Sequence, residues 1–396
     1  MRARDHGIVL GLLPPGPANA ITDVAGVRVG HCTLVRGEGP RLVGEGPVRT
    51  GVTVIVPHDG DPFVEPVFAG CHRLNGNGEL TGLEWVRESG QLSSPVALTN
   101  THSVGVVRDA LLAHAARTHP SGTDFWSLPV VGETWDGLLN DINGFHVRPE
   151  HLEAALAAAA AGPVAEGSIG GGTGMICHEL KGGIGTASRR LPDEAGGWTV
   201  GALVQANYGR RELLRVDGVP IGQEIPVTDL PSPWRAAPAM SASPLPDGFG
   251  RQSPAPGHRA LRTGSVIVVV ATDAPLLPHQ CARLAQRAGL GLARLGSIAG
   301  NSSGDIFLAF ATGNRDLPRA ALDADARREM TVRYLNDTTL DPLYQGTVEA
   351  TEEAVVNALL TAGTMTGCDG ITAHGLDGER VVQVMARYGR GPRAGR

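Results

Sequence analysis

The segment that decides the interpretation of this chain reads RTGSVIVVVATD, residues 262–273. Its β-branched run, Val266 to Val270, predicts a buried strand, and a Gly-Ser pair marks the turn before it. Residues 228–263 upstream show no periodicity and are rich in Pro, Ser, Ala, Gly and Arg. A loop of that length in a compact chain is either functional or a processed linker.

The Gly-Ser pair also allows a specific chemical interpretation. The hydroxyl of Ser265 could attack the carbonyl carbon of Gly264, which has no Cβ to block the approach, and water would then release two chains. The second chain would begin with Ser265, whose α-amine, with a pKa near ~7.7, is a base in the same residue as the nucleophile. Ordinary turn chemistry accounts for a Gly-Ser pair equally well.

Composition narrows the possible partners and cofactors. The chain has 396 residues, enough for one large domain or two smaller ones, and a formal net charge of −6. It has no basic stripe with interleaved aromatic residues, so we expect no nucleic-acid partner. The five cysteines are an odd number without a CxxC pair, and no HExxH motif occurs. We therefore expect no disulfide framework, no metal site and no cofactor.

The amino-terminal region does not resemble a targeting signal. Pro14 and Pro15 interrupt the apolar stretch that follows the first residues, which makes a poor secretory signal. No run of 18 apolar residues follows anywhere in the chain. We expect a cytoplasmic protein without a membrane partner.

The order of predicted elements favours layered α+β packing. Strands precede helices in blocks on both sides of the Gly-Ser pair, without the regular βαβ alternation of a doubly wound sheet. Strands are expected over residues 21–34, 51–57, 96–100, 200–207, 213–216, 266–270, 305–312 and 381–386. Helices are expected over residues 106–117, 149–161, 278–294, 319–336 and 341–362.

A glycine-rich stretch at residues 167–175 invites comparison with phosphate-binding loops. A P-loop needs a lysine directly after its last glycine, but the chain's only lysine, Lys181, lies further on. The dinucleotide-binding fingerprint needs a preceding strand, whereas a helix is expected here. Nucleotide binding is therefore disfavoured, although the backbone of such a loop could line an active site.

Polar residues interrupt apolar strands at four places, the positions from which side chains reach into a cleft. Each place alone could equally be a cap, a turn or a surface. Together they supply a nucleophile, an amide donor, a hydroxyl and a carboxylate, which is a hydrolase-like set. No serine has the flanking glycines of a GxSxG elbow. The four places are residues 133–137, residues 205–209, Ser265 and residues 301–305.

Seven segments, spread in order over most of the chain, resemble one family. They are residues 75–79, 98–105, 133–142, 170–188, 204–207, 264–273 and 300–310. The family comprises the self-processing L-aminopeptidase/D-amidase-esterases (DmpA) and the related β-peptidyl aminopeptidases. Seven ordered matches are far more specific than any single motif, so they favour the cleavage chemistry at Ser265 over a plain turn.

The resemblance implies a fold and an assembly. The fold would be a four-layer α/β/β/α sandwich of the type shared with ornithine acetyltransferase. Residues 1–396 would form a single self-processing domain, cut between Gly264 and Ser265 into chains of residues 1–264 and 265–396. The two chains would stay together, and two-chain units would assemble into a homotetramer.

The resemblance also implies a role for each candidate site residue. Ser265 would be the nucleophile and its free amine the base of a serine aminopeptidase, an N-terminal-nucleophile hydrolase. Asn207 would donate to the oxyanion, and Ser303 and Asp305 would position and tune the Ser265 amine. Glu133 would bind the free amino group of a small peptide or amino-acid amide. Amides, with esters as an additional class, would be opened through an acyl-enzyme.

One position departs from the family pattern. The peptidase members have a tyrosine that helps to stabilise the tetrahedral intermediate, and this chain has Trp135 there. An indole N–H can donate a hydrogen bond but cannot accept one. Two alternatives therefore stay open: an amidase of the nylon-oligomer hydrolase type, although those enzymes use Thr where this chain has Ser265, and a non-catalytic relative with a decayed site.

Overall fold

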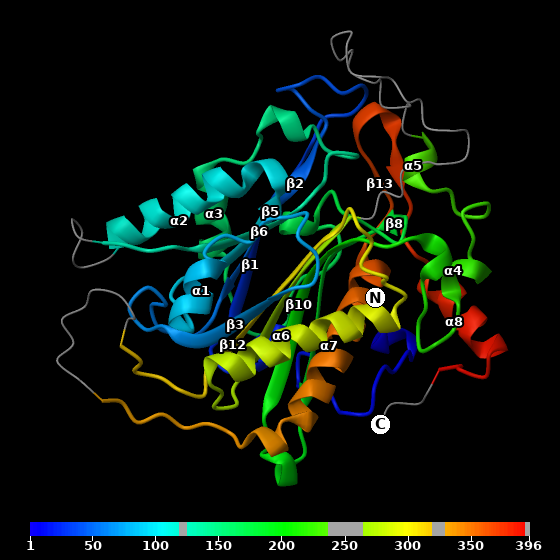
Figure 1. Cartoon of the computed structure of the whole chain (residues 1–396). Helices are drawn as coiled ribbons and strands as arrows, with labels where there is room; N and C mark the ends of the chain where they lie inside the picture. The colour runs from blue at the N-terminus through cyan, green and yellow to red at the C-terminus, as the bar shows by residue number, and fades with distance from the viewer. Residues whose placement is uncertain (119–124, 237–263, 319–328, 393–396) are drawn as a thin grey trace, which may run out of the picture.

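The computed structural model describes residues 1–118, 125–236, 264–318 and 329–392, and two sheets form its centre (Figure 1). The first sheet has four strands in the order β1-β2-β5-β6. The pairs β1–β2 and β2–β5 are antiparallel, and β5–β6 is parallel. The strands are β1 (Arg28–Arg36), β2 (Val48–Val56), β5 (Val96–Asn100) and β6 (Val130–Thr134).

The second sheet has six strands in the order β4-β3-β12-β11-β10-β9. Its two strands from the carboxyl-terminal side of Gly264, β11 and β12, are parallel to each other and lie between β3 and β10. The two parts of the chain therefore share one sheet. The strands are β3 (Val67–Arg73), β4 (Gln91–Leu92), β9 (Gly183–Arg190), β10 (Thr199–Asn207), β11 (Ser265–Thr272) and β12 (Gly304–Ala311).

Helices cover the outer face of each sheet. The helices α2 (Val104–Thr118) and α3 (Pro149–Ala157) pack on the four-stranded sheet through an apolar cluster. The helices α6 (Pro278–Arg294) and α7 (Asp341–Thr361) cover the six-stranded sheet. A third cluster fills the space between the sheets. The expected four-layer α/β/β/α sandwich is confirmed (Figure 1).

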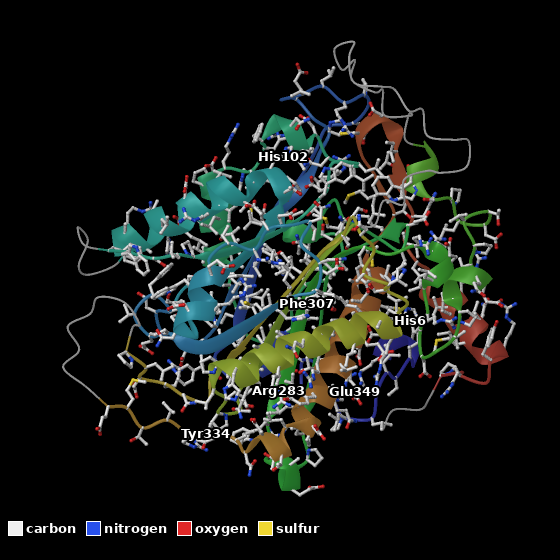
Figure 2. All side chains as sticks on the ribbon, in the orientation of Figure 1. His6, His102, Arg283, Phe307, Tyr334 and Glu349 are labelled. Carbon is white, nitrogen blue, oxygen red and sulfur yellow. The ribbon has the colours of Figure 1, made fainter. Side chains whose placement is uncertain are left out.

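The side-chain alternation of β11 explains its unbroken apolar run. Val266, Val268 and Val270 belong to the core beneath the helices, whereas Ile267 and Val269 belong to the core between the sheets. Both faces of the strand are buried, so neither face selects polar residues. On the neighbouring strand, Phe307 likewise points toward α6 (Figure 2).

A buried ion-pair network joins α7 to the six-stranded sheet. The fully buried guanidinium of Arg189 on β9 pairs with Glu353 at 2.7 Å and with Glu349 at 3.2 Å. Burial alone would raise the pKa of Glu353, but Arg189 and Arg4 outweigh burial and hold that pKa below its usual value. Removing Arg189 would leave Glu353 with Arg4 as its remaining ion-pair partner and would deprive Glu349 of its buried guanidinium, so this network fixes α7 against β9.

Several predicted elements need correction. Residues 381–386 lie in the helix α8 (Gly378–Arg387) rather than in a strand, because the buried residues Val381, Val384 and Met385 follow helical spacing. Residues 213–216 do not pair with β10, whose partners are β9 and β11. Residues 21–34 begin with a 3₁₀ turn before β1. Residues 329–336 are not helical, and residues 319–328 lie outside the described part of the chain.

The remaining elements are short. None of the helices in the described ranges combines the length and the apolar character that crossing a membrane would require. The short helices and strands are α1 (Leu83–Ser89), α4 (Ile221–Glu224), α5 (Pro233–Ala236), β7 (Ile176–Cys177), β8 (Leu180–Lys181), β13 (Met365–Thr366) and β14 (Thr372–Ala373).

Candidate active site

Three strand ends meet at the candidate site. Asn207 ends β10, Ser265 begins β11 and Gly304 begins β12. In the register of the sheet, Asn207 lies opposite Ser265, and Ser265 lies opposite Gly304. Neighbouring strands are about 4.8 Å apart, so these three residues are in direct lateral contact. Asn207 and Ser265 are both buried, each with only 6% of its surface exposed.

Gly264 fits against Asn207 more tightly than any other residue could. A Cβ atom at position 264 would lie 1.5 Å from the carbonyl oxygen of Asn207 and 3.2 Å from its Nδ2. The first contact is impossible for two non-bonded atoms, so this approach requires glycine. The same closeness puts the side-chain amide of Asn207 beside the residue that precedes Ser265.

The amide of Asn207 is held in one orientation. Its Oδ1 accepts a hydrogen bond from the backbone N–H of Ile176 at 2.8 Å, and its Nδ2 donates to the carbonyl oxygen of Trp135 at 2.9 Å. An amide nitrogen carries two hydrogens, so one remains for another acceptor. A fixed donor of this kind is what an oxyanion site needs.

Ser303 and Asp305 form a buried pair on either side of Gly304. The hydroxyl of Ser303 donates to Oδ1 of Asp305 at 2.6 Å, and Asn75 Nδ2 lies 3.4 Å from Oδ2. Burial raises the pKa of Asp305, while the bonds from Ser303 and Asn75 lower it. Asp305 is the register partner of Val266, which faces the helices. The pair therefore approaches the start of β11 from the helix-facing side of the sheet.

Glu133 comes from the other sheet, at the end of β6. Its Oε1 accepts a hydrogen bond from the backbone N–H of Glu79 at 3.0 Å, and its Oε2 accepts one from the hydroxyl of Thr101. Burial raises the pKa of this carboxyl group. A Cβ on Gly78 would lie 3.0 Å from Oε1 of Glu133 and 3.2 Å from Cα of Gly304. One loop thus joins Glu133 to the strand ends.

Trp135 reaches the site through its backbone. Its carbonyl oxygen is the acceptor that holds the amide of Asn207, and its half-buried ring stacks on Trp234 with a centroid distance of 6.0 Å and an interplanar angle of 12°. All the candidate residues named from the sequence, from Glu133 to Asp305, are therefore linked through direct contacts or adjacent strand ends.

Lys181 was assigned no role from the sequence. In the structure it holds the backbone segment next to Asn207 in place. It is fully buried, and its ammonium donates to the carbonyl oxygens of Met175 at 2.9 Å and Gly182 at 2.7 Å. Burial lowers its pKa to about 7. These bonds fix the segment that carries Ile176, whose N–H orients Asn207. The available signal was that Lys181 is the chain's only lysine and lies six residues after the glycine-rich stretch of residues 167–175.

Two further residues, Asn75 and Thr101, also hold the site without having been assigned a role. Asn75 donates to the carbonyl oxygens of Ala299 and Gly300, both at 2.9 Å, and so ties down the loop before β12. Thr101 binds Glu133. Both lie in segments that resemble the aminopeptidases, and that resemblance was the only signal in the sequence that could have found them.

Comparison with known proteins gives this arrangement a family. The model of peptidase family S58 matches residues 19–373. The chain belongs to peptidase family S58. The beta-peptidyl aminopeptidase of Sphingosinicella microcystinivorans is 45% identical to this S58 peptidase over 391 residues, covering 98% of this chain and 93% of the relative. The resemblance seen in the sequence is thereby confirmed.

Solved structures agree on the fold of this S58 peptidase. A beta-aminopeptidase from Burkholderia sp. is 52% identical, with a TM-score of 0.85, and the match covers 98% of this chain and 99% of the other. The L-aminopeptidase D-Ala-esterase/amidase of Ochrobactrum anthropi is 42% identical, with a TM-score of 0.82 and the same coverage. That structure is described as a variant of the Ntn hydrolase fold, and this chain shares its architecture.

Proposed function

We propose that this S58 peptidase is a self-activated serine aminopeptidase whose nucleophile is Ser265. The observation that carries the proposal is the contact between Gly264 and Asn207, because it combines a residue without a Cβ, a fixed amide donor and a serine at one point. The names of the relatives, which include aminopeptidases, support the same reaction class.

Self-cleavage would proceed by an acyl shift. Oγ of Ser265 attacks the carbonyl carbon of Gly264, the C–N bond breaks, and the nitrogen takes up the proton to become the α-amine of Ser265. Water then hydrolyses the ester, which leaves a carboxyl group on Gly264 and restores the hydroxyl. The remaining N–H of Asn207 would stabilise the oxyanion of the intermediate.

Turnover would reuse the same groups. The α-amine of Ser265 accepts the hydroxyl proton as Oγ attacks the substrate carbonyl, and it returns that proton to the departing amine. Water then releases the acyl group from Oγ. The Ser303–Asp305 pair would hold the α-amine and tune its protonation.

Glu133 would give the enzyme its requirement for a free amino terminus. Its carboxylate is buried and already held by two donors, so a substrate ammonium would meet an oriented negative charge. Short peptides and amino-acid amides are the proposed substrates, esters are an additional class, and the names of two relatives point to β-peptides. The homotetramer and the cytoplasmic location stay predictions.

The mass of the purified protein under denaturing conditions tests self-activation. We expect two species corresponding to residues 1–264 and 265–396, with serine at the new amino terminus. A single full-length species without turnover would contradict the proposal and favour the non-catalytic relative.

Replacing Glu133 with glutamine should reduce the selectivity for free-amine substrates. Losing a charge-assisted contact of about 1.5–3 kcal/mol lowers kcat/KM for free-amine amides by roughly 10–100-fold, while N-acetylated amides stay unchanged. Kinetics on both substrate sets measure the effect, and the exposed Glu84→Gln serves as the matched control. Equal losses on both sets, or none, would instead favour the amidase alternative without an amine requirement.

A further inference from the structure

A small cavity lies next to Ser303, between the end of β10 and the loop that precedes β12. Its volume is about 10 Å³, and Tyr208, Ser297, Gly300 and Ser303 contribute to its lining. A space of this volume corresponds to about one water molecule. The cavity thus connects the residue that follows Asn207 with the serine that binds Asp305.

Tyr208, which lines this cavity, has an unsatisfied hydroxyl group. Its side chain is only 3% exposed, and its hydroxyl has no hydrogen-bond partner among the described residues. Leaving a buried hydroxyl unpaired costs about 1–3 kcal/mol. Burial, with further contributions from Cys177 and Asp305, raises the pKa of Tyr208 well above its usual value, so the group stays a neutral O–H donor.

Ser303 offers the second partner. Its hydrogen is committed to Asp305, which leaves the lone pairs of Oγ free to accept a hydrogen bond. Ser303 is 2% exposed and lines the same cavity as Tyr208. A buried water needs two to four polar partners, and a donor and an acceptor are both present here.

We propose that the cavity binds a structural water that links the Tyr208 hydroxyl to Oγ of Ser303, which makes Tyr208 a positioning residue for the Ser303–Asp305 pair. Tyr208 donates to the water, the water donates to Ser303, and Ser303 donates to Asp305. Each bond in such a chain polarises the next, so the carboxylate form of Asp305 is favoured. The inference rests on the proposed function, in which this pair tunes the Ser265 amine.

Three other titratable groups lie close to Tyr208, and their protonation bears on how the pH profile is interpreted. They are His178, Cys177 and Glu352. The ring centroids of His178 and Tyr208 are 5.1 Å apart, and burial lowers the pKa of His178 to about 4. Burial raises the pKa of the Cys177 thiol to about 12. From α7, Glu352 pairs with Arg294 at 3.0 Å, and burial raises its pKa. Because glutamine does not titrate, a pH limb that persists in the Glu352→Gln variant cannot come from Glu352 and can be assigned to Asp305.

The test compares Tyr208→Phe with the wild-type, processed protein. Removing the hydroxyl should lower kcat/KM about two- to tenfold and move the acid limb of its pH profile upward by about half to one pH unit, because Asp305 loses support for its charged form. Self-cleavage and substrate KM should change little. The matched control is Tyr344→Phe, since that buried hydroxyl on α7 also has no partner among the described residues.

The outcomes separate this inference from the proposed function. A folded Tyr208→Phe protein with the wild-type pH profile overturns the inference while the wild-type enzyme remains active. A wild-type protein that neither cuts itself nor turns over substrate overturns the proposed function itself. If Tyr208→Phe fails to fold, a high-resolution crystal structure of the wild-type protein decides: a water bonded to both Tyr208 Oη and Ser303 Oγ supports the inference, and its absence overturns it.

Discussion

Replacing Ser265 with alanine is expected to abolish both self-cleavage and hydrolysis. The variant removes the only atom that could form the ester with Gly264, so the purified protein should remain one full-length chain. It would then also lack the free α-amine, because that amine is created only by the cut. Rates should fall by about four orders of magnitude or more, as with the loss of other enzymic nucleophiles.

Three companion measurements make this result specific. Ser93→Ala, a serine between β4 and β5, should cut and turn over like the wild type. Ser265→Thr keeps a hydroxyl and should retain partial cleavage, slowed by its β-branched side chain. Thermal unfolding shows whether each variant is folded. If the Ser265→Ala protein still separates after residue 264 and hydrolyses amides, then Ser265 is not the nucleophile.

Layered α+β packing could be predicted because long apolar segments dominate it, whereas the order of the four layers was implied only by the family resemblance. The unbroken apolar run of β11 and the long helical segments of α6 and α7 can be recognised in the sequence itself. The strand β9 was not predicted, because it contains glycine, serine, threonine and arginine instead of a β-branched run. Its neighbours explain this composition: a Cβ on Gly185 would lie 1.9 Å from the carbonyl oxygen of Ala354 on α7. Only tertiary packing reveals that constraint.

The candidate site shows a similar division. Polar residues at strand ends can be recognised locally, but their meeting depends on how the two sheets pack. Gln205 on β10 joins the sheets by donating to the carbonyl oxygen of Thr99 at 2.9 Å and to the hydroxyl of Thr134 at 2.9 Å. That bridge brings Glu133 and Trp135 toward Asn207, and no spacing in the sequence encodes it.

Trp135 contacts the site through a different group from the one that the sequence suggested. Because Trp135 stands where the peptidase members have tyrosine, its indole N–H was the candidate replacement donor. The contact seen in the structure is the Trp135 carbonyl oxygen, which any residue at this position could supply. We therefore expect the oxyanion to depend more on Asn207 than it would if Trp135 also donated, since the Asn207 amide is the oriented group next to Gly264.

Replacing Asn207 with aspartate should accordingly have the second-largest effect. The change keeps an acceptor for the N–H of Ile176 but puts an oxygen where Nδ2 now donates to Trp135, so the oxyanion loses its donor. Loss of one such donor costs about 10²–10³ in kcat. Self-cleavage should slow by a similar factor, so full-length chain should accumulate and convert over hours.

Time-resolved denaturing mass spectrometry and steady-state kinetics would measure the two rates on the same preparation. Asn336→Asp is the matched control, because that exposed asparagine caps a 3₁₀ turn and aspartate caps as well as asparagine does. Asn207→Ala, which introduces no charge, should lose a similar factor. If both variants at position 207 keep cleavage and turnover within about threefold of the wild type, the oxyanion is stabilised by other groups, and the next residues to test are Trp135 and the backbone amides beside it.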